Sequence, residues 1–266
     1  MPGEGLLLNS MKHFFPIIRE IIGLYRLPSV VEIGADKGET TMLLIYEKKK
    51  GNIGELIVIE PFPSERISAW SEGKEIDLRP TRSLEVLPRL PLKDVYIIDG
   101  DHNYYTVYHE LKVIFGKNKT ERKDIVIFCH DVCWPWDRRD MYYDPESIPV
   151  EHRHRYTTEM GVVLHDEGVV PGGFGGFPIA VRRGGPKNGV LTAIEDAISE
   201  CDDYRFFKVE GIFGLGVIVP SWHRDFSKIE AVIAPFADNY LIRKLERNRV
   251  EIYLELLRVC HHVVKS

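Results

Sequence analysis

The feature that most constrains the fold is a series of short apolar runs that alternate with helical segments in the first half of the chain. The runs occupy residues 29–33, 55–60, 95–99 and 124–131, and helical periodicity fills most of the stretches between them. Strands that are apolar on both faces are typical of parallel sheets covered by helices on both sides. The pattern predicts a doubly wound, Rossmann-like α/β sheet, with one more strand near 75–81.

Further elements are expected to complete this sheet and to flank it. They are a helix over 9–27 that ends before Pro28, a helix over 189–200, strands over 204–209 and 213–220, and a helical segment from 227 onward, interrupted at Pro235. The two late strands predict an antiparallel hairpin, because only turn residues separate them. The last segment carries an apolar stripe that caps the sheet or pairs with another subunit.

Residues 133–190 break the alternation. They are dense in Trp, Tyr, Arg, Gly and Pro and show no sustained period. Long connections of this kind in a compact domain are usually functional. We expect a lid, or an insertion that lines a substrate site.

Composition narrows the class of protein. Of 266 residues, 44% are apolar and 28% charged, as in a globular protein. No run approaches the roughly 18 apolar residues of a membrane span, and the N-terminus lacks a signal-peptide pattern, which predicts a cytoplasmic protein. The net charge of −5 argues against a nucleic-acid partner. The cysteines match no zinc spacing and are expected to be reduced: Cys129, Cys133, Cys201 and Cys260.

Two polar features follow the first two predicted strands. The first strand leads into Glu32-x-Gly34-x-x-x-Gly38, and the second ends at Glu60. Glycines let a backbone pass close to a ligand, a new helix offers free N–H groups, and an acid after the second strand can hold ribose hydroxyls. Together they predict a site for an adenosine-containing cofactor. Taken singly, the first is equally a tight strand-to-helix turn, and the second a solvated acid.

The stretch "IIDGDHNYY" at 97–105 and the features above resemble class I S-adenosylmethionine-dependent methyltransferases. Within that class they resemble the small-molecule O-methyltransferase and cephalosporin-hydroxylase-like branch. The resemblance runs from about Ser29 to Asp131 and returns in the predicted hairpin. It implies a single domain over 1–266 with a seven-stranded, mostly parallel sheet. Its parts would be an N-terminal helix (1–28), a cofactor-binding half (29–132), a lid (133–190), a sheet completion (191–220) and a C-terminal helical segment (221–266).

The resemblance also assigns residues to the cofactor. Glu32, Gly34 and Gly38 would surround its amino acid end, Glu60 its ribose and Ser83 the edge of its adenine, with Pro61 and Phe62 as an apolar surface. The complete predicted set is Glu32, Gly34, Ala35, Gly38, Thr41, Glu60, Pro61, Phe62, Ser83 and Asp99.

Metal-dependent relatives place a divalent cation beside the methyl donor. The matching residues here are Asp99, His130 and Asp131. A histidine among oxygen ligands leaves Mg²⁺, Mn²⁺ and Fe²⁺ all open. His102 stands where catechol-type relatives carry their base, and His130 is its rival; the alternative for each histidine is a purely local hydrogen bond within the turn.

For the acceptor we expect contacts from the insertion, namely Trp134, Arg138, Arg139 and Tyr142, with Trp136 and Tyr143 extending an aromatic wall. A salt-bridged surface loop is the alternative for the arginines. The leading hypothesis is an O-methyltransferase acting on a small hydroxylated metabolite, a sugar or secondary-metabolite scaffold, with neither a nucleic-acid nor a membrane partner, and with homo-oligomers left open. The alternatives are an iron-dependent hydroxylase, a metal-independent methyltransferase and a non-catalytic binding protein on the same fold.

Overall fold

A computed structural model describes residues 10–265, with side chains to residue 260. Among these residues seven strands form one sheet in the order β10-β11-β5-β4-β1-β2-β3. Strand β11 runs antiparallel to both of its neighbours, and the other pairs are parallel. This confirms the predicted mostly parallel sheet and its antiparallel hairpin. The strands are β1 (Ser29–Ile33), β2 (Glu55–Ile59), β3 (Asp77–Arg79), β4 (Val95–Ile98), β5 (Val126–His130), β10 (Tyr204–Val209) and β11 (Leu215–Pro220).

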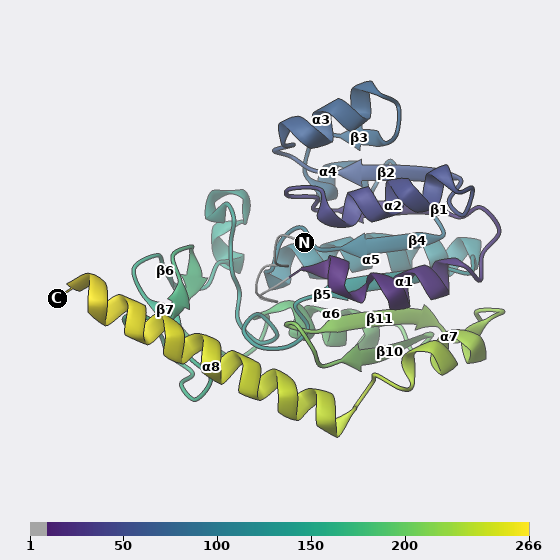
Figure 1. Ribbon diagram of the computed structural model, residues 1–266. Coiled ribbons are helices and arrows are strands. Elements are labelled where there is room, and N and C mark those ends of the chain that lie inside the picture. The colour runs from purple at the N-terminus through teal and green to yellow at the C-terminus, as the bar shows by residue number, and fades with distance from the viewer. Residues whose placement is uncertain (1–9, 266) are drawn as a thin grey trace.

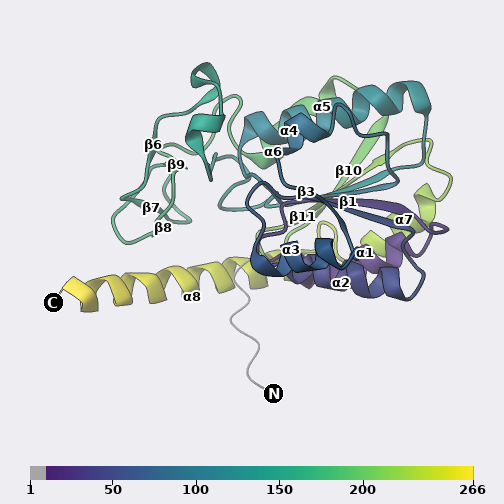
Figure 2. The same ribbon diagram turned by 90° about the horizontal axis from the view of Figure 1, so that it is seen from above.

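Helices cover both faces of the sheet, as Figure 2 shows. Within β1, Val30 and Val31 point to opposite faces and enter two separate apolar clusters, as the two-residue period of a strand requires. One face carries α4 (Ser83–Val86), α5 (Tyr104–Glu121) and α6 (Val190–Ser199). The other carries α1 (Phe15–Ile22), α2 (Glu39–Lys49), α3 (Glu65–Glu72) and α7 (Phe226–Ile233).

Two elements differ from expectation. The predicted N-terminal helix is a 3-10 turn, η1 (Met11–Phe14), followed by α1, and it ends at Ile22 rather than near Leu27; its expected first residue, Asn9, lies outside the described residues. Helix α3 had no counterpart in the prediction, although Ser64 caps it by accepting a hydrogen bond from the Ile67 amide. The predicted interruption of the C-terminal segment at Pro235 is confirmed, because this residue lies between two helices, α7 and α8 (Tyr240–Lys265).

The insertion between β5 and α6 is ordered and lies beyond the carboxyl ends of the parallel strands (Figure 1). It contains two small antiparallel pairs and two 3-10 turns: β6 (Tyr156–Thr157) with β9 (Ile179–Ala180), β7 (Gly161–Val162) with β8 (Phe174–Gly175), η2 (Pro145–Ser147) and η3 (Val150–His152). Buried Asp140 holds it to the core by accepting hydrogen bonds from the amides of Tyr104 and Gly189 and from the Tyr142 hydroxyl. Burial raises the pKa of Asp140 to about 6.

None of the helices within residues 10–265 is long and apolar enough to cross a membrane. Helix α8 leaves the sheet at one edge and runs past the insertion (Figure 1).

Candidate active site

A cavity of about 490 Å³ lies beyond the carboxyl ends of β1, β2 and β4. Ligands bind at this edge in open α/β sheets because the connecting loops leave a crevice there. Six of the residues predicted to hold the cofactor line it: Gly34, Glu60, Pro61, Phe62, Ser83 and Asp99. Four other residues predicted to hold the cofactor do not line the cavity within the described part of the chain: Glu32, Ala35, Gly38 and Thr41.

Gly34 brings the end of β1 against the end of β4. Its φ is +84°, and a Cβ on it would lie 2.3 Å from the Cα of Gly100. Only glycine combines a left-handed φ with so close an approach. Gly38 is also left-handed, but a Cβ there would meet the ring of Trp70 at 2.5 Å. Gly38 therefore serves the packing of α2 on α3.

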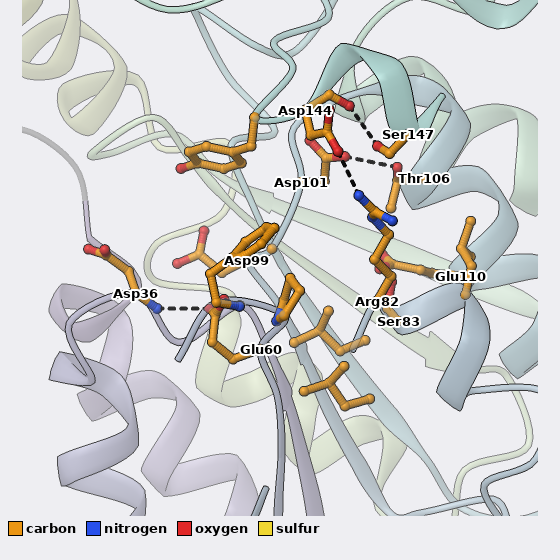
Figure 3. Close-up of a pocket in the computed structure, with 18 of the residues that line it drawn as sticks. Asp36, Glu60, Arg82, Ser83, Asp99, Asp101, Thr106, Glu110, Asp144 and Ser147 are labelled. Carbon is orange, nitrogen blue, oxygen red and sulfur yellow. Dashed lines mark hydrogen bonds and ion pairs between the residues drawn. The ribbon is translucent and has the colours of Figure 1, made fainter. Parts of the chain in front are cut away.

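The carboxylate of Glu60 stabilises the turn that begins at Gly34. One carboxylate oxygen accepts hydrogen bonds from the amides of Ala35 (2.9 Å) and Asp36 (3.2 Å), and the other accepts one from the Phe62 amide (2.9 Å). A carboxylate has about four acceptor sites, so the pair of oxygens still has capacity for a ligand hydroxyl. Figure 3 shows Glu60 beside Asp36 at one end of the cavity.

Glu32 lies below this turn, inside the sheet. It is 1% exposed, and its Oε2 has no hydrogen-bond partner among the described residues. Burial raises its pKa to about 8, while the Thr41 hydroxyl acts in the opposite direction. Glu32 is therefore a neutral acid near pH 7.

Two carboxylates and two imidazoles meet beside the cavity, at the ends of β4 and β5. Nδ1 of His102 lies 2.9 Å from Oδ2 of Asp131, and Nδ1 of His130 lies 3.1 Å from Oδ1 of Asp99 and 3.3 Å from Oδ2 of Asp131. Burial works against charge on both rings, but the neighbouring carboxylates outweigh it and raise the pKa of each histidine, that of His130 strongly. Asp131 has its pKa lowered by the same two imidazoles, against its burial.

Both ring nitrogens of His130 are engaged. Nε2 lies 3.1 Å from the carbonyl oxygen of Ile212, an acceptor that only an N–H can satisfy, while Nδ1 faces two carboxylates. The ring satisfies all of these groups as an imidazolium, so His130 is a buried positive charge between Asp99 and Asp131.

His102 is arranged differently. Asp131 orients the ring through Nδ1, and Nε2 faces the Tyr143 hydroxyl at 3.3 Å. Tyr143 comes from the insertion, lines the cavity and is 66% exposed. A carboxylate that holds Nδ1–H leaves Nε2 with a lone pair directed at the cavity wall, which is the arrangement of a general base.

A divalent cation is compatible with a related set of residues. Asp99, His102 and Asp131 offer ligand atoms that all lie within 4.8 Å of one another. Within the described part of the chain, Oδ1 of Asp131 is buried without a hydrogen-bond partner. This donor set suits a cation once His102 exchanges its hydrogen bond for the metal. It includes His102 in place of the predicted His130.

None of the four residues predicted to bind the acceptor is among the described residues that line the cavity. Arg138 binds Glu195 on the surface, with Nη2 and Oε1 2.7 Å apart. Arg139 is buried and donates to the carbonyls of Ala180, Glu167 and Gly168. The Tyr142 hydroxyl donates to Asp140, and Trp134 packs edge-on against Phe213. Arg139 and Tyr142 therefore hold the insertion together, while Arg138 and Trp134 attach it to the rest of the domain.

Sequence reasoning missed several residues that line the cavity, of which Glu110 is the most informative. The others include Asp36, Lys37, Ser64, Arg82, Tyr105, Thr106, Asp144, Ser147 and Ile148. Glu110 falls on the apolar stripe of α5, three residues after Val107 and four before Ile114. An acid at a buried helical position was the signal that could have identified it.

Comparison with known protein families identifies a methyltransferase domain in this chain. A family model described as "Methyltransferase domain" matches residues 31–132. No curated protein matches the chain.

Several solved structures resemble the fold at low identity. A Staphylococcus aureus protein assigned as a caffeoyl-CoA O-methyltransferase is 12% identical over 78% of this chain and 83% of that chain, with a TM-score of 0.45. The S-adenosylhomocysteine-bound methyltransferase PaMTH1 of Podospora anserina is 14% identical over 76% and 75%, with a TM-score of 0.42. A Listeria monocytogenes protein assigned as an S-adenosylmethionine-dependent methyltransferase is 12% identical over 79% and 98%, with a TM-score of 0.46. Values this low say nothing about substrate.

The domain match covers the strands β1 to β5, which build the glycine turn, Glu60 and the Asp99 loop. On this evidence residues 31–132 form a methyltransferase domain of the class I S-adenosylmethionine-dependent type, within a sheet of the same order.

Proposed function

We propose that the enzyme methylates a hydroxyl group of a small acceptor, a sugar or a secondary-metabolite scaffold, and that His102 removes the proton. The observation that carries this proposal is the Asp131–His102 pair, which directs Nε2 at the wall of the cavity beside Tyr143. A hydroxyl is a poor nucleophile near neutral pH until its proton is removed. An amine acceptor that is already neutral would need no such base.

The cofactor would lie along the cavity. Gly34 and Asp36 face its amino acid end, Glu60 its ribose and Ser83 its adenine, and Asp99 separates the ribose from the His102 cluster. Figure 3 supports this order, because Asp36 and Glu60 lie at one end of the cavity and Ser83 at the other. Pro61 and Phe62 also line the cavity.

In this proposal His102, Asp131 and His130 have different roles in the methyl transfer. The bound cofactor supplies a methyl group on a positively charged sulfur. His102 accepts the acceptor's proton at Nε2 while Asp131 stabilises the imidazolium that forms. The acceptor oxygen would then receive the methyl group, with S-adenosylhomocysteine as the second product. The His130 imidazolium offsets one of the two negative charges of Asp99 and Asp131, so one negative charge remains to stabilise His102 when it becomes charged.

A cation-assisted reaction is the second candidate, favoured by the convergence of Asp99, His102 and Asp131. A bound Mg²⁺ or Mn²⁺ would lower the pKa of the acceptor hydroxyl. In that case His102 is a ligand and cannot be the base. Iron bound stoichiometrically by the same three residues would instead point to the hydroxylase alternative.

Calorimetry with S-adenosylhomocysteine tests the cofactor site. Wild type is expected to bind, and Glu60→Ala to bind at least tenfold more weakly, because it loses the ribose acceptor and leaves three amides unpaired. Glu72→Ala, an exposed acid on α3, is the matched control. Absence of binding by wild type would refute the cofactor assignment.

Release of S-adenosylhomocysteine from S-adenosylmethionine, measured across a panel of catechols, sugars and amines, tests the reaction. The His102→Gln variant should bind the cofactor normally and lose at least a hundredfold in turnover. Turnover on amines alone would contradict O-methylation. A His102→Gln variant as active as wild type would remove the base.

A further inference from the structure

Glu110 is a buried acid that the proposed reaction does not use. It projects from α5, is 0% exposed and contributes to the lining of the cavity. Neither of its carboxyl oxygens makes a hydrogen bond to any residue within 10–265. Leaving a buried polar group unpaired costs about 1–3 kcal/mol, so the presence of Glu110 calls for a partner that residues 10–265 do not supply.

The surroundings of Glu110 make it a neutral acid. Val107, Leu111 and Ile114 occupy the same buried face of α5. Burial raises the pKa of Glu110 to about 8, against a smaller opposite effect of the nearby Ser83 hydroxyl. A neutral carboxyl group presents one O–H donor and one carbonyl acceptor side by side.

The position of Glu110 limits what its partner can be. Figure 3 shows Glu110 with Arg82 and Ser83 at the end of the cavity opposite Asp36 and Glu60. The guanidinium of Arg82 is engaged by Asp144, at 2.6 Å, which leaves Glu110 and Ser83 to meet a ligand at this end. A cofactor whose ribose lies at Glu60 directs its base toward them.

We propose that Glu110 reads the amino edge of the adenine base: its carbonyl oxygen accepts from the exocyclic amine, and its O–H donates to the adjacent ring nitrogen. Donor and acceptor sit side by side on that edge of adenine, as they do on the carboxyl group. The inference rests on the proposed cofactor site. It adds a specificity-determining residue to that site, on a helix outside the glycine turn and Glu60.

Three proteins and two ligands test the proposal. Wild type, Glu110→Gln and Glu110→Leu are each titrated calorimetrically with S-adenosylhomocysteine and with its analogue that lacks the 6-amino group. Glutamine keeps a donor and an acceptor, whereas leucine keeps only the approximate volume. Thermal unfolding without ligand is measured for all three.

Glu110→Leu should bind S-adenosylhomocysteine about tenfold or more weakly than wild type, and Glu110→Gln within a few fold of it. Wild type should prefer S-adenosylhomocysteine to the analogue, and Glu110→Leu should lose that preference, as a double-mutant cycle requires for a direct contact. Without ligand, the melting temperature of Glu110→Leu should be equal to or above that of wild type, because this variant removes an unpaired buried acid. Affinity and stability then change in opposite directions, which a purely structural residue would not show.

The same titrations distinguish failure of the cofactor site from failure of the role proposed for Glu110. A wild type that does not bind S-adenosylhomocysteine overturns the cofactor site and this inference with it. A wild type that binds both ligands equally overturns only the role of Glu110, and this result stands even if Glu110→Leu fails to fold. Equal binding of S-adenosylhomocysteine by wild type and Glu110→Leu does the same, since Glu110 would then contact only water.

Discussion

Arg82 and Asp144 join two sides of the cavity through an ion pair, with Nη2 and Oδ2 2.6 Å apart. Arg82 precedes α4, Asp144 belongs to the insertion, and both residues line the cavity. This pair therefore links the insertion to the core directly at the proposed adenine end. The neighbouring Ser147 hydroxyl donates to the Asp144 carbonyl and supports the same turn.

Breaking this ion pair should loosen the insertion over the cofactor. Both side chains are nearly half exposed, so the pair contributes about 1 kcal/mol at most. Arg82→Gln should raise the dissociation rate of S-adenosylhomocysteine up to about fivefold with little loss of stability, as measured by stopped-flow. Lys112→Ala, which breaks an ion pair of similar exposure with Glu200 outside the cavity, is the control. Equal dissociation rates at low salt would show that the pair does not restrain the insertion.

Alanine at Gly34 should destabilise the protein far more than alanine at Gly51. Both glycines have positive φ (+84° and +79°), but a Cβ at Gly34 would collide with Gly100, while nothing lies within 4 Å of one at Gly51. Gly51→Ala is expected to cost about 1–2 kcal/mol for the left-handed backbone, and Gly34→Ala about 1–3 kcal/mol more for the clash. Urea unfolding of both variants measures the difference. Equal losses would mean that the turn relaxes without cost.

The ends of the strands were predictable from sequence because a parallel strand is apolar on both faces and stops abruptly at a polar residue. Glu60 and Asp99 followed from that rule, and Gly34 from the need for a close turn. Helix α3 was missed because its only buried side chain is Ile67, which leaves little apolar periodicity.

Local sequence patterns do not predict which residues far apart in the chain form hydrogen bonds with one another. His102 and His130 follow neighbouring strands, so both were candidates for metal and base. The carbonyl of Ile212, 82 residues further along the chain, separates them by engaging Nε2 of His130. In the same way, the sequence predicts acceptor contacts for the arginines of the insertion, with a salt-bridged surface loop as the alternative. The alternative holds for Arg138, which pairs with Glu195, and the carbonyls that surround Arg139 come from residues 167, 168 and 180.

The stability of the protein should fall as pH rises, in part because of Glu32. Its pKa is about 8 in the folded state and about 4.5 when exposed, so the folded state binds the extra proton between these values. The stabilising effect is complete below about pH 4.5 and is lost as pH approaches 8, with a slope of at most about 1.4 kcal/mol per pH unit. Glu32→Gln should reduce the dependence of the unfolding free energy on pH between 5 and 8 without abolishing it, because Glu110 also has a pKa of about 8, while Glu72→Gln should leave it unchanged. A slope that Glu32→Gln does not alter would place the titration elsewhere.

Turnover should survive exhaustive chelation, because the His130 imidazolium already places a positive charge between Asp99 and Asp131. Removing that charge should create a need for a cation: His130→Asn can still donate a hydrogen bond but carries no charge, so its turnover is expected to fall and to recover in part with Mg²⁺. The exposed His165→Asn is the control. Assays with and without EDTA and Mg²⁺, using the acceptor found in the panel, measure this. A wild type that loses its activity to EDTA and regains it with Mg²⁺ would instead assign the cation to Asp99, His102 and Asp131, and proton removal would need a residue other than His102.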